Sequence, residues 1–133
     1  MERKIDILLI EDDPDDVELL QDALIRHGII YHMHIIHEGN AAIEYVRTCT
    51  DSPHIIVLDY NLPKVHGREI LKEIKTHSPL KEIPVLVLST SSSPGDSQFA
   101  YENGAAKFLV KPTTLEQIRE TANVIATLAS PHQ

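Results

Sequence analysis

Residues 55–63 are IIVLDYNLP, an unbroken aliphatic run that ends on an aspartate and a turn. A short continuous apolar run is typical of a strand that is buried on both faces of a parallel sheet. Comparable runs occur at Ile5 to Ile10, Val85 to Leu88 and Lys107 to Val110. Tyr31 to Ile36 differs, because His32 and His34 alternate with apolar side chains. That alternation predicts a strand at the sheet edge with one face in water.

The segments between these runs are long enough to form crossover helices. Asp13 is placed as an N-cap with Pro14 at the first helical position, and Gly28 ends this helix. Thr114 and Gln117 predict a capping box at the start of the last helix. The other helices are predicted at Asn40 to Cys49, Gly67 to Thr76, Gly95 to Asn103 and, after the capping box, Leu115 to Ala129.

Five strands that alternate with five helices predict an α/β sandwich of three layers, a parallel sheet with helices on both faces. At 133 residues and 42% hydrophobic content, the chain fits a single domain over residues 1–133. Only residues 130–133 follow the last predicted helix, so we expect no output domain. Ligands in such sheets bind beyond the carboxyl ends of the strands, where the strand order reverses.

Charge and cysteine content exclude several classes of protein. Twenty acidic and twelve basic residues give a formal net charge of −8, which opposes binding to a nucleic-acid backbone. Cys49 is the only cysteine and cannot form an internal disulfide. No apolar stretch has the length of a signal peptide core or a membrane span. We therefore expect a cytoplasmic protein with neither nucleic acid nor membrane as a partner.

Carboxylates follow two of the predicted strands. Glu11 and Asp12 come after the first strand, and Asp59 ends the third. In the strand order 2-1-3-4-5 these strands are neighbours, so the three carboxylates converge and need a cation to offset their repulsion. Mg²⁺ prefers such oxygen ligands. We expect Asp12 and Asp59 to bind it directly, Glu11 through water, and the backbone carbonyl of Asn61 to add a further ligand.

A fixed cation and a hydroxyl complete this predicted pocket. Lys111 and Ser89 follow the fifth and fourth strands, and their side chains suit the oxygens of a transferring phosphoryl group. Asp59 would then be the nucleophile that forms an aspartyl phosphate. A cis peptide bond between Lys111 and Pro112 is a hypothesis that the sequence leaves open, since a tight turn there would aim the lysine inward.

Several motifs occur along the chain in a fixed order: Glu11-Asp12, Asp59 with Asn61-Leu62-Pro63 and Gly67, Ser89-Thr90, Gly104-Ala105 and Lys111-Pro112. Together they resemble the receiver domains of response regulators across essentially the whole chain. The resemblance implies a flavodoxin-like fold and Mg²⁺-dependent transfer of a phosphoryl group from a sensor histidine kinase to Asp59. It also implies slow hydrolysis that resets the switch. Ser89 and Phe108 correspond to the family's switch pair. In that pair the hydroxyl moves toward the phosphate, and the aromatic ring then moves inward.

The sequences of residues 11–16, 61–64 and 88–91 resemble those of single-domain regulators that pair with bacterial and cyanobacterial phytochromes. This narrower resemblance implies a phytochrome as the partner kinase, with a downstream protein as the target. His66 departs from the pattern, because those relatives usually carry an acid there. Asn61 and Ser91 occupy the variable positions that tune dephosphorylation in the family.

Two other functions compete with this interpretation. A phosphohydrolase of the haloacid dehalogenase type also has an aspartate nucleophile beside Mg²⁺, but it needs a second carboxylate two residues later, where Asn61 stands. An adaptor that has lost phosphorylation should lack acidic or lysine positions that this chain retains. We therefore expect a phosphoacceptor signalling protein rather than an enzyme.

The last predicted helix suggests an assembly. Its expected core stripe is Leu115, Ile118, Ala122, Ile125 and Ala129. Val124 and Leu128 form a second apolar pair, which either lies in a wide core stripe or is exposed. The exposed alternative predicts a homodimer through the face of helix 95–103, strand 107–110 and helix 115–129. The resemblance favours the dimer, since many receivers associate through this face and signal through it.

The remaining polar residues have structural interpretations. Asp15 and Asp16 are assigned to the positive end of the first helix dipole. His32 and His34 lack a third ligand for zinc and are interpreted as exposed edge residues. Cys49 is expected to be a small buried side chain late in its helix.

Overall fold

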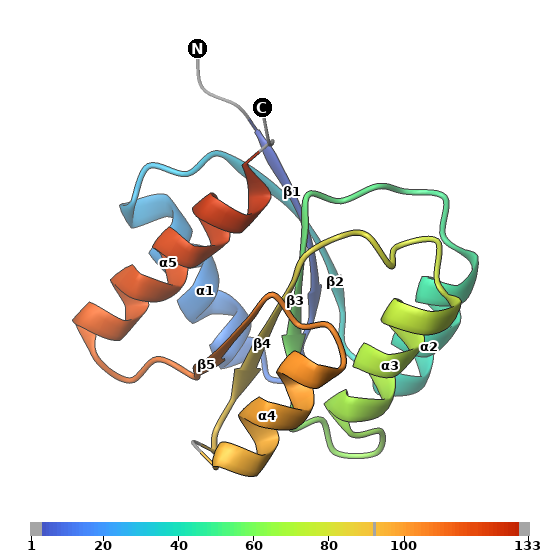
Figure 1. The fold of residues 1–133 in the computed structure, drawn as a ribbon. Helices are drawn as coiled ribbons and strands as arrows, with labels where there is room; N and C mark the ends of the chain where they lie inside the picture. Colours follow the sequence, from blue (N-terminus) through green and yellow to red (C-terminus); the bar gives the residue numbers. More distant parts are fainter. Residues whose placement is uncertain (1–3, 92, 131–133) are drawn as a thin grey trace.

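The computed structural model describes residues 4–91 and 93–130 and contains a five-stranded sheet between two helical layers (Figure 1). The strands are β1 (Ile5–Ile10), β2 (Tyr31–Ile36), β3 (Ile55–Asp59), β4 (Val85–Ser89) and β5 (Lys107–Val110). The helices are α1 (Pro14–Arg26), α2 (Gly39–Thr48), α3 (Gly67–His77), α4 (Pro94–Glu102) and α5 (Leu115–Ala129). All pairings are parallel in the order β2-β1-β3-β4-β5. The predicted flavodoxin-like fold and strand order are confirmed.

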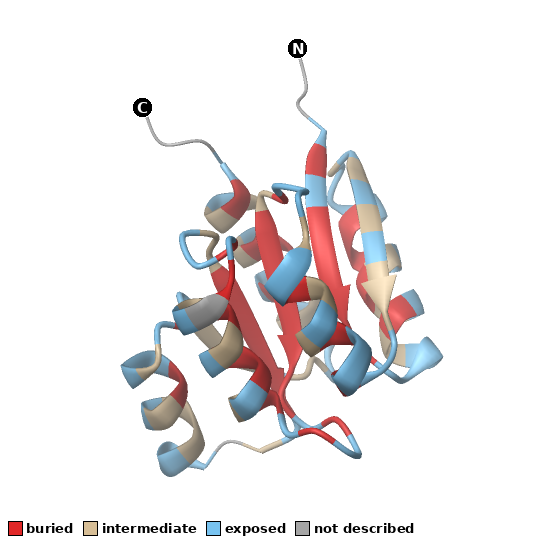
Figure 2. Ribbon diagram, turned by 90° about the vertical axis from the view of Figure 1, so that its right-hand side faces the viewer, coloured by how far each residue is buried: buried red, intermediate tan, exposed pale blue. Residues whose placement is uncertain are grey.

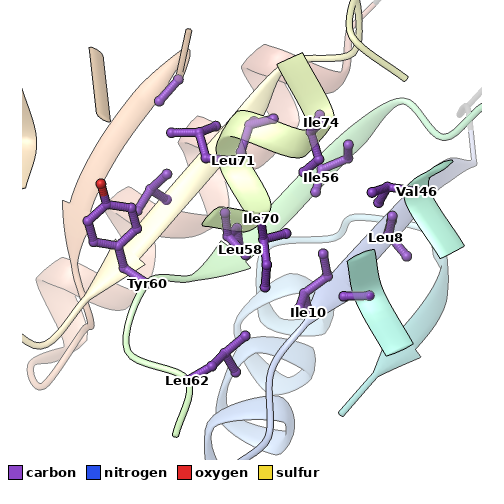
Figure 3. Packing of buried hydrophobic residues seen from close by; sticks show 14 of the residues in the cluster. Leu8, Ile10, Val46, Ile56, Leu58, Tyr60, Leu62, Ile70, Leu71 and Ile74 are labelled. Atoms are coloured by element: carbon purple, nitrogen blue, oxygen red, sulfur yellow. The ribbon is translucent and has the colours of Figure 1, made fainter. Parts of the chain in front are cut away.

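The sheet separates two apolar clusters. Helices α1 and α5 cover one face, and α2, α3 and α4 cover the other (Figure 1). Every residue of β3 and β4 is buried, as the continuous aliphatic runs predicted, whereas β2 alternates exposed with half-buried residues at the sheet edge (Figure 2). Ile70 and Ile74 of α3 pack over Ile56 and Leu58 of β3 (Figure 3). This packing fixes the strand ends from which the candidate site is built.

The first helix begins and ends as predicted. The Asp13 side chain accepts a hydrogen bond of 2.9 Å from the backbone N–H of Asp15, and Pro14 is the first helical residue. After the last residue, Arg26, the chain turns at Gly28, whose φ of +71° lies in the left-handed region that glycine tolerates. The N-terminus of α1 is therefore firmly placed beside the end of β1.

The predicted capping box of α5 forms only in part. Thr114 accepts a hydrogen bond of 3.1 Å from the N–H of Gln117, as expected of an N-cap. The Gln117 side chain reaches one residue further back and accepts 2.8 Å from the N–H of Thr113. The glutamine therefore fixes the loop before the helix rather than the cap residue itself.

The hypothesis of a cis peptide bond at Lys111-Pro112 is wrong. The structure has no cis peptide bond among the described residues, so Lys111-Pro112 is trans. The N–H of Lys111 donates 2.8 Å to the carbonyl of Ser89. Lys111 thus continues the pairing of β5 with β4 beyond Val110, and this extended backbone aims the lysine without a tight turn.

The predicted core stripe of α5 is correct from Ala122 to Ala129 and wrong at its start. Ala122, Ile125 and Ala129 are buried, but Leu115 is 74% exposed because no described element covers the first turn. Val124 and Leu128 are half-buried against the cluster beneath α1 and α5. They therefore belong to a wide core stripe, the alternative that the sequence left open.

Cys49, predicted as the last residue of its helix, lies just outside the helix. Helix α2 ends at Thr48, and Cys49 follows as its C-cap, half-buried against the cluster under α2. Burial raises the pKa of its thiol, and the nearby Asp51 carboxylate adds to this effect. Both influences disfavour the reactive thiolate.

Candidate functional site

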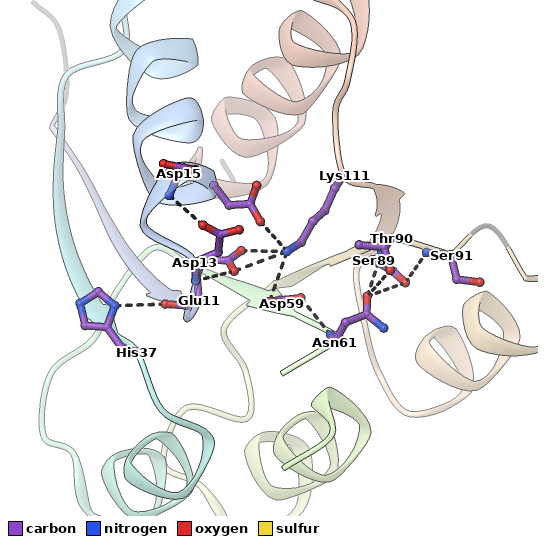
Figure 4. Close-up of polar contacts among 11 residues, drawn as sticks. Glu11, Asp13, Asp15, His37, Asp59, Asn61, Ser89, Thr90, Ser91 and Lys111 are labelled. Atoms are coloured by element: carbon purple, nitrogen blue, oxygen red, sulfur yellow. Dashed lines mark hydrogen bonds and ion pairs between the residues drawn. The ribbon is translucent and has the colours of Figure 1, made fainter. Parts of the chain in front are cut away.

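The side chains singled out by the sequence meet at the carboxyl edge of the sheet (Figure 4). Glu11 follows β1, Asp59 ends β3, Ser89 ends β4 and Lys111 follows β5. Glu11 and Asp59 are each only 2% exposed, and Ser89 is fully buried. The parallel order places these strand ends side by side, which is why residues distant in sequence share one pocket.

Three carboxylates form a compact donor set. Glu11, Asp12 and Asp59 each offer one oxygen, and these oxygens lie within 4.8 Å of one another. Asp12 is exposed and forms the open side, whereas the other two are buried. A set of hard oxygen donors with one open side fits Mg²⁺ or Mn²⁺, which take carboxylates and retain other oxygen ligands. The structure therefore brings the predicted acidic metal ligands together.

Burial changes the protonation of Glu11. The pKa of Glu11 rises to about 8, chiefly through burial and then through its hydrogen bond with Asp59 and the repulsion between the two carboxylates. Attraction to Lys111 and the N–H of Asp13 offset part of this rise. Near neutral pH Glu11 consequently keeps its proton when no cation is bound, and a cation must displace that proton.

Lys111 lies among the carboxylates. Its Nζ is 2.8 Å from Asp16, 3.3 Å from Asp59 and 3.4 Å from Glu11. Burial lowers the pKa of Lys111, but the hydrogen bond with Asp16 and the attraction of Glu11 and Asp59 outweigh it and raise the pKa overall. The ammonium thus stays charged.

Sequence reasoning assigned Asp16 only to the helix dipole and missed its contact with Lys111. The available signal was its place in the first turn of α1, directly after the end of β1.

Asn61 connects the phosphoacceptor candidate to β4. Its N–H donates 2.9 Å to Asp59 Oδ1, and its side-chain oxygen accepts 2.8 Å from the N–H of Thr90 and 3.2 Å from the hydroxyl of Ser89. Ser89 in turn accepts 3.1 Å from the N–H of Ser91. The hydroxyl is thereby held beside the pocket. The role of the Asn61 carbonyl as a metal ligand stays a prediction.

Phe108, predicted as the aromatic switch residue, is half-buried on β5. Its ring meets the ring of Tyr60 edge-on at 5.8 Å, and Tyr60 is fully buried directly after Asp59. Gly67 allows this packing, because a Cβ there would lie 2.5 Å from the Cα of Tyr60. Tyr60 thus connects the pocket to Phe108, a contact that the sequence analysis missed. The available signal was an aromatic residue directly after the aliphatic run of β3.

The arrangement has counterparts among known proteins. Residues 7–123 match the response regulator receiver domain. The chain belongs to this family. The matched residues include the whole apolar cluster under α2, α3 and α4 and every residue of the pocket described above.

Individual relatives agree with this assignment. The response regulator Rcp1 of Synechocystis is 38% identical over 117 residues, which cover 84% of this chain and 80% of Rcp1. A probable methanogenesis regulatory protein, FilR2 of Methanothrix harundinacea, is 37% identical over 90% of this chain and 79% of its own.

Two solved structures are similar to this receiver domain over most of its length. The Mn²⁺-bound form of Rcp1 has a TM-score of 0.79 at 35% identity, covering 92% of both chains. The phosphorylated cyanobacterial phytochrome response regulator RcpA has a TM-score of 0.80 at 34% identity, covering 92% of this chain and 91% of that one. The predicted resemblance to phytochrome regulators is confirmed. This chain is therefore a response regulator receiver domain of two-component systems.

No helix within residues 4–91 and 93–130 combines the length and apolarity that crossing a bilayer requires.

Proposed function

We propose that this receiver domain accepts a phosphoryl group on Asp59 from a sensor histidine kinase, in a reaction that requires Mg²⁺. The observation that carries the proposal is the setting of the Asp59 carboxylate. It is buried, it shares a donor set with Glu11 and Asp12, and its Oδ2 lies 3.3 Å from Lys111 Nζ. The solved relatives add support, since Rcp1 is described with Mn²⁺ and RcpA in a phosphorylated form.

The side chains of the pocket have different roles in phosphoryl transfer. A carboxylate oxygen of Asp59 attacks phosphorus, the P–N bond to the donor imidazole breaks, and the imidazole nitrogen takes the electron pair. Lys111 and Ser89 bind oxygens of the phosphoryl group and offset their charge. Asp12, Asp59 and the Asn61 carbonyl would hold Mg²⁺ directly and Glu11 through water, and the bound ion would supply further positive charge.

Phosphorylation changes the conformation of the protein through the switch pair, Ser89 and Phe108. When the Ser89 hydroxyl turns toward the phosphoryl oxygens, it gives up its hydrogen bond to Asn61, and Phe108 moves inward against Tyr60. The surface formed by α4, β5 and α5 changes as a result. We propose a phytochrome as the partner kinase by analogy with RcpA, and a downstream protein that binds this surface.

The protein acts as a phosphoacceptor with slow hydrolysis and not as a phosphohydrolase. The residue two positions after Asp59 is Asn61, whose amide oxygen accepts bonds from Thr90 and Ser89. An amide held in this way cannot act as a general acid for a leaving group. Rapid turnover of small phosphate monoesters would contradict this assignment.

Labelling with a small phosphodonor tests the proposal directly. Wild-type protein with Mg²⁺ should take up one hydroxylamine-labile phosphoryl group, and either a chelator or Asp59→Asn should abolish the label. Loss of label is informative only if the variant is folded, which circular dichroism checks. Full labelling of Asp59→Asn, or of wild type in chelator, would refute the proposal.

Homodimer formation through the α4, β5 and α5 face is part of the same proposal. Leu115 is 74% exposed and Val110 is 38% exposed on this face, so an apolar contact is available there. Light scattering should detect a dimer that Leu115→Glu disrupts. Because Val124 and Leu128 are half-buried in the core, charges at those positions would test folding rather than assembly. A monomeric wild type in both phosphorylation states would exclude the dimer.

A further inference from the structure

The closest partner of the Lys111 ammonium is Asp16, which has no place in the reaction described so far. The Asp16 carboxylate lies 2.8 Å from Nζ, whereas the carboxylates of Asp59 and Glu11 lie at 3.3 and 3.4 Å. A distance of 2.8 Å is that of a strong charge-assisted hydrogen bond, and the other two are long for one. Asp16 therefore holds the ammonium most tightly.

Asp16 itself is held by a rigid element. It lies in the first turn of α1, where Asp13 caps the helix and Pro14 fixes the backbone. A lysine is a point charge on a flexible stem and needs an anchor before it can occupy one position in a pocket. A carboxylate on a fixed helical turn provides that anchor.

The three hydrogens of the ammonium can be assigned from these contacts. One points to Asp16 on α1, which leaves two that face Asp59 and Glu11. Asp16 is not part of the donor set of Glu11, Asp12 and Asp59, so it competes for the lysine and not for a cation. A phosphoryl group on Asp59 would meet an ammonium that already has its free hydrogens turned toward it.

We infer that Asp16 is a positioning residue for phosphoryl transfer, which holds Lys111 so that its free N–H groups face the oxygens of the phosphoryl group on Asp59. The inference rests on the proposed function of Asp59. It assigns α1 a role in the chemistry through one side-chain contact, with no direct contact between Asp16 and the phosphoryl group.

The chain supplies a matched control in Asp15. This residue is exposed in the same helical turn, and its side chain makes none of the three contacts of Lys111. Asp15→Asn and Asp16→Asn remove the same charge from the same region, but only the second removes the anchor. A difference between them therefore reports the contact and not the net charge.

The first measurement is the rate of labelling by acetyl phosphate at saturating Mg²⁺. Asp16→Asn should react about tenfold more slowly than Asp15→Asn, the size expected from losing one hydrogen bond to a charged group. In a Lys111→Ala background, where the labelling rate is already low, Asp16→Asn should have no further effect. Non-additivity of this kind shows that Asp16 acts through Lys111.

The second measurement is spectroscopic and needs no reaction. In protein labelled with ¹⁵N-lysine, an anchored Lys111 ammonium should give an ordered ¹H–¹⁵N signal, assigned by its loss in Lys111→Ala. Asp15→Asn should retain that signal, and Asp16→Asn should lose it while its thermal midpoint stays near that of Asp15→Asn.

Two outcomes would overturn the inference while leaving the proposed function intact. Equal labelling rates for Asp16→Asn and Asp15→Asn would show that the contact does not matter, and faster labelling of Asp16→Asn would show that Asp16 withholds the lysine. By contrast, a wild type that takes up no label would refute the proposed function itself.

Discussion

Charged clusters lie at both ends of the sheet, and only one of them is buried. At the carboxyl ends, Glu11 and Asp59 are each 2% exposed and surround Lys111. At the amino ends, Asp6 lies 3.9 Å from His32 and 4.0 Å from His54, yet the side chain of Asp6 is 52% exposed. Water screens the second cluster and not the first. Burial, and not composition, therefore distinguishes the carboxyl-end cluster from the amino-end cluster.

Hydrogen bonding separates the two clusters as well. The His54 ring nitrogen accepts 2.9 Å from the N–H of Asp6, so that histidine is occupied in fixing the start of β1 beside β3. In the other cluster the Lys111 ammonium is shared by three carboxylates. One cluster supports the backbone, and the other holds more carboxylates than cations, an excess that a bound divalent cation would offset.

The largest effect is expected from removing the single cation of the buried cluster. Lys111→Ala leaves Glu11, Asp16 and Asp59 without their shared partner, which should cost about 2 kcal/mol of unfolding free energy in chelator. Urea denaturation measures this cost, and Mg²⁺ should restore part of it. If the variant were as stable as wild type in chelator, the ammonium would not be balancing these acids.

The pH dependence of stability comes next in size. Glu11 keeps its proton in the folded protein up to a pKa of about 8, against an ordinary value of 4.5 in the unfolded chain. The folded state therefore binds more protons between these values, and the contribution of Glu11 to stability is present below pH 4.5 and lost as the pH rises through 8.

Denaturation of the wild type in chelator should therefore show a steeper loss of stability from pH 5 to 8 than Glu11→Gln, which cannot lose a proton. Parallel curves for the two proteins would contradict the raised pKa.

A smaller gain in stability is expected from Asp12→Ala. Removing the exposed member of the acidic set relieves repulsion in the metal-free state, so the urea midpoint in chelator should rise slightly. The same change should abolish Mg²⁺-dependent labelling because a metal ligand is lost. Normal labelling of this variant would show that Asp12 is not a ligand of the metal.

The smallest effect is expected at the amino ends of the strands. Asp6→Asn removes an exposed charge beside His32 and His54, and unfolding free energy should change by less than about 0.5 kcal/mol. Labelling should be unaffected. A change as large as that of Lys111→Ala would show that exposure does not distinguish the two clusters.

Local patterns were sufficient for most of the fold. Continuous aliphatic runs predicted the strands, and Asp13 with Pro14 predicted the start of α1, because hydrophobic period and capping chemistry depend on neighbours in the sequence. The exposure of Leu115 was not predictable in this way. Helical spacing shows which face a residue lies on, but not whether another element covers it.

The sequence predicted the residues of the candidate site only at positions next to the ends of strands. Glu11, Asp59, Ser89 and Lys111 each adjoin a predicted strand, and parallel topology brings such positions together. Asp16 and Tyr60 were missed as site neighbours, because their contacts depend on the approach of a helix or a ring from another element.

Strand period and motif spacing are local properties, so they indicate which residue types stand at the carboxyl end of each strand. The sharing of charge among those groups depends on the packing of the folded chain. Whether Lys111 binds Asp16 more closely than Asp59, and whether Glu11 keeps its proton near neutral pH, depends on distances and burial that arise only when β1, α1, β3 and β5 pack together. Electrostatic energies vary with both, so no one-dimensional pattern specifies them.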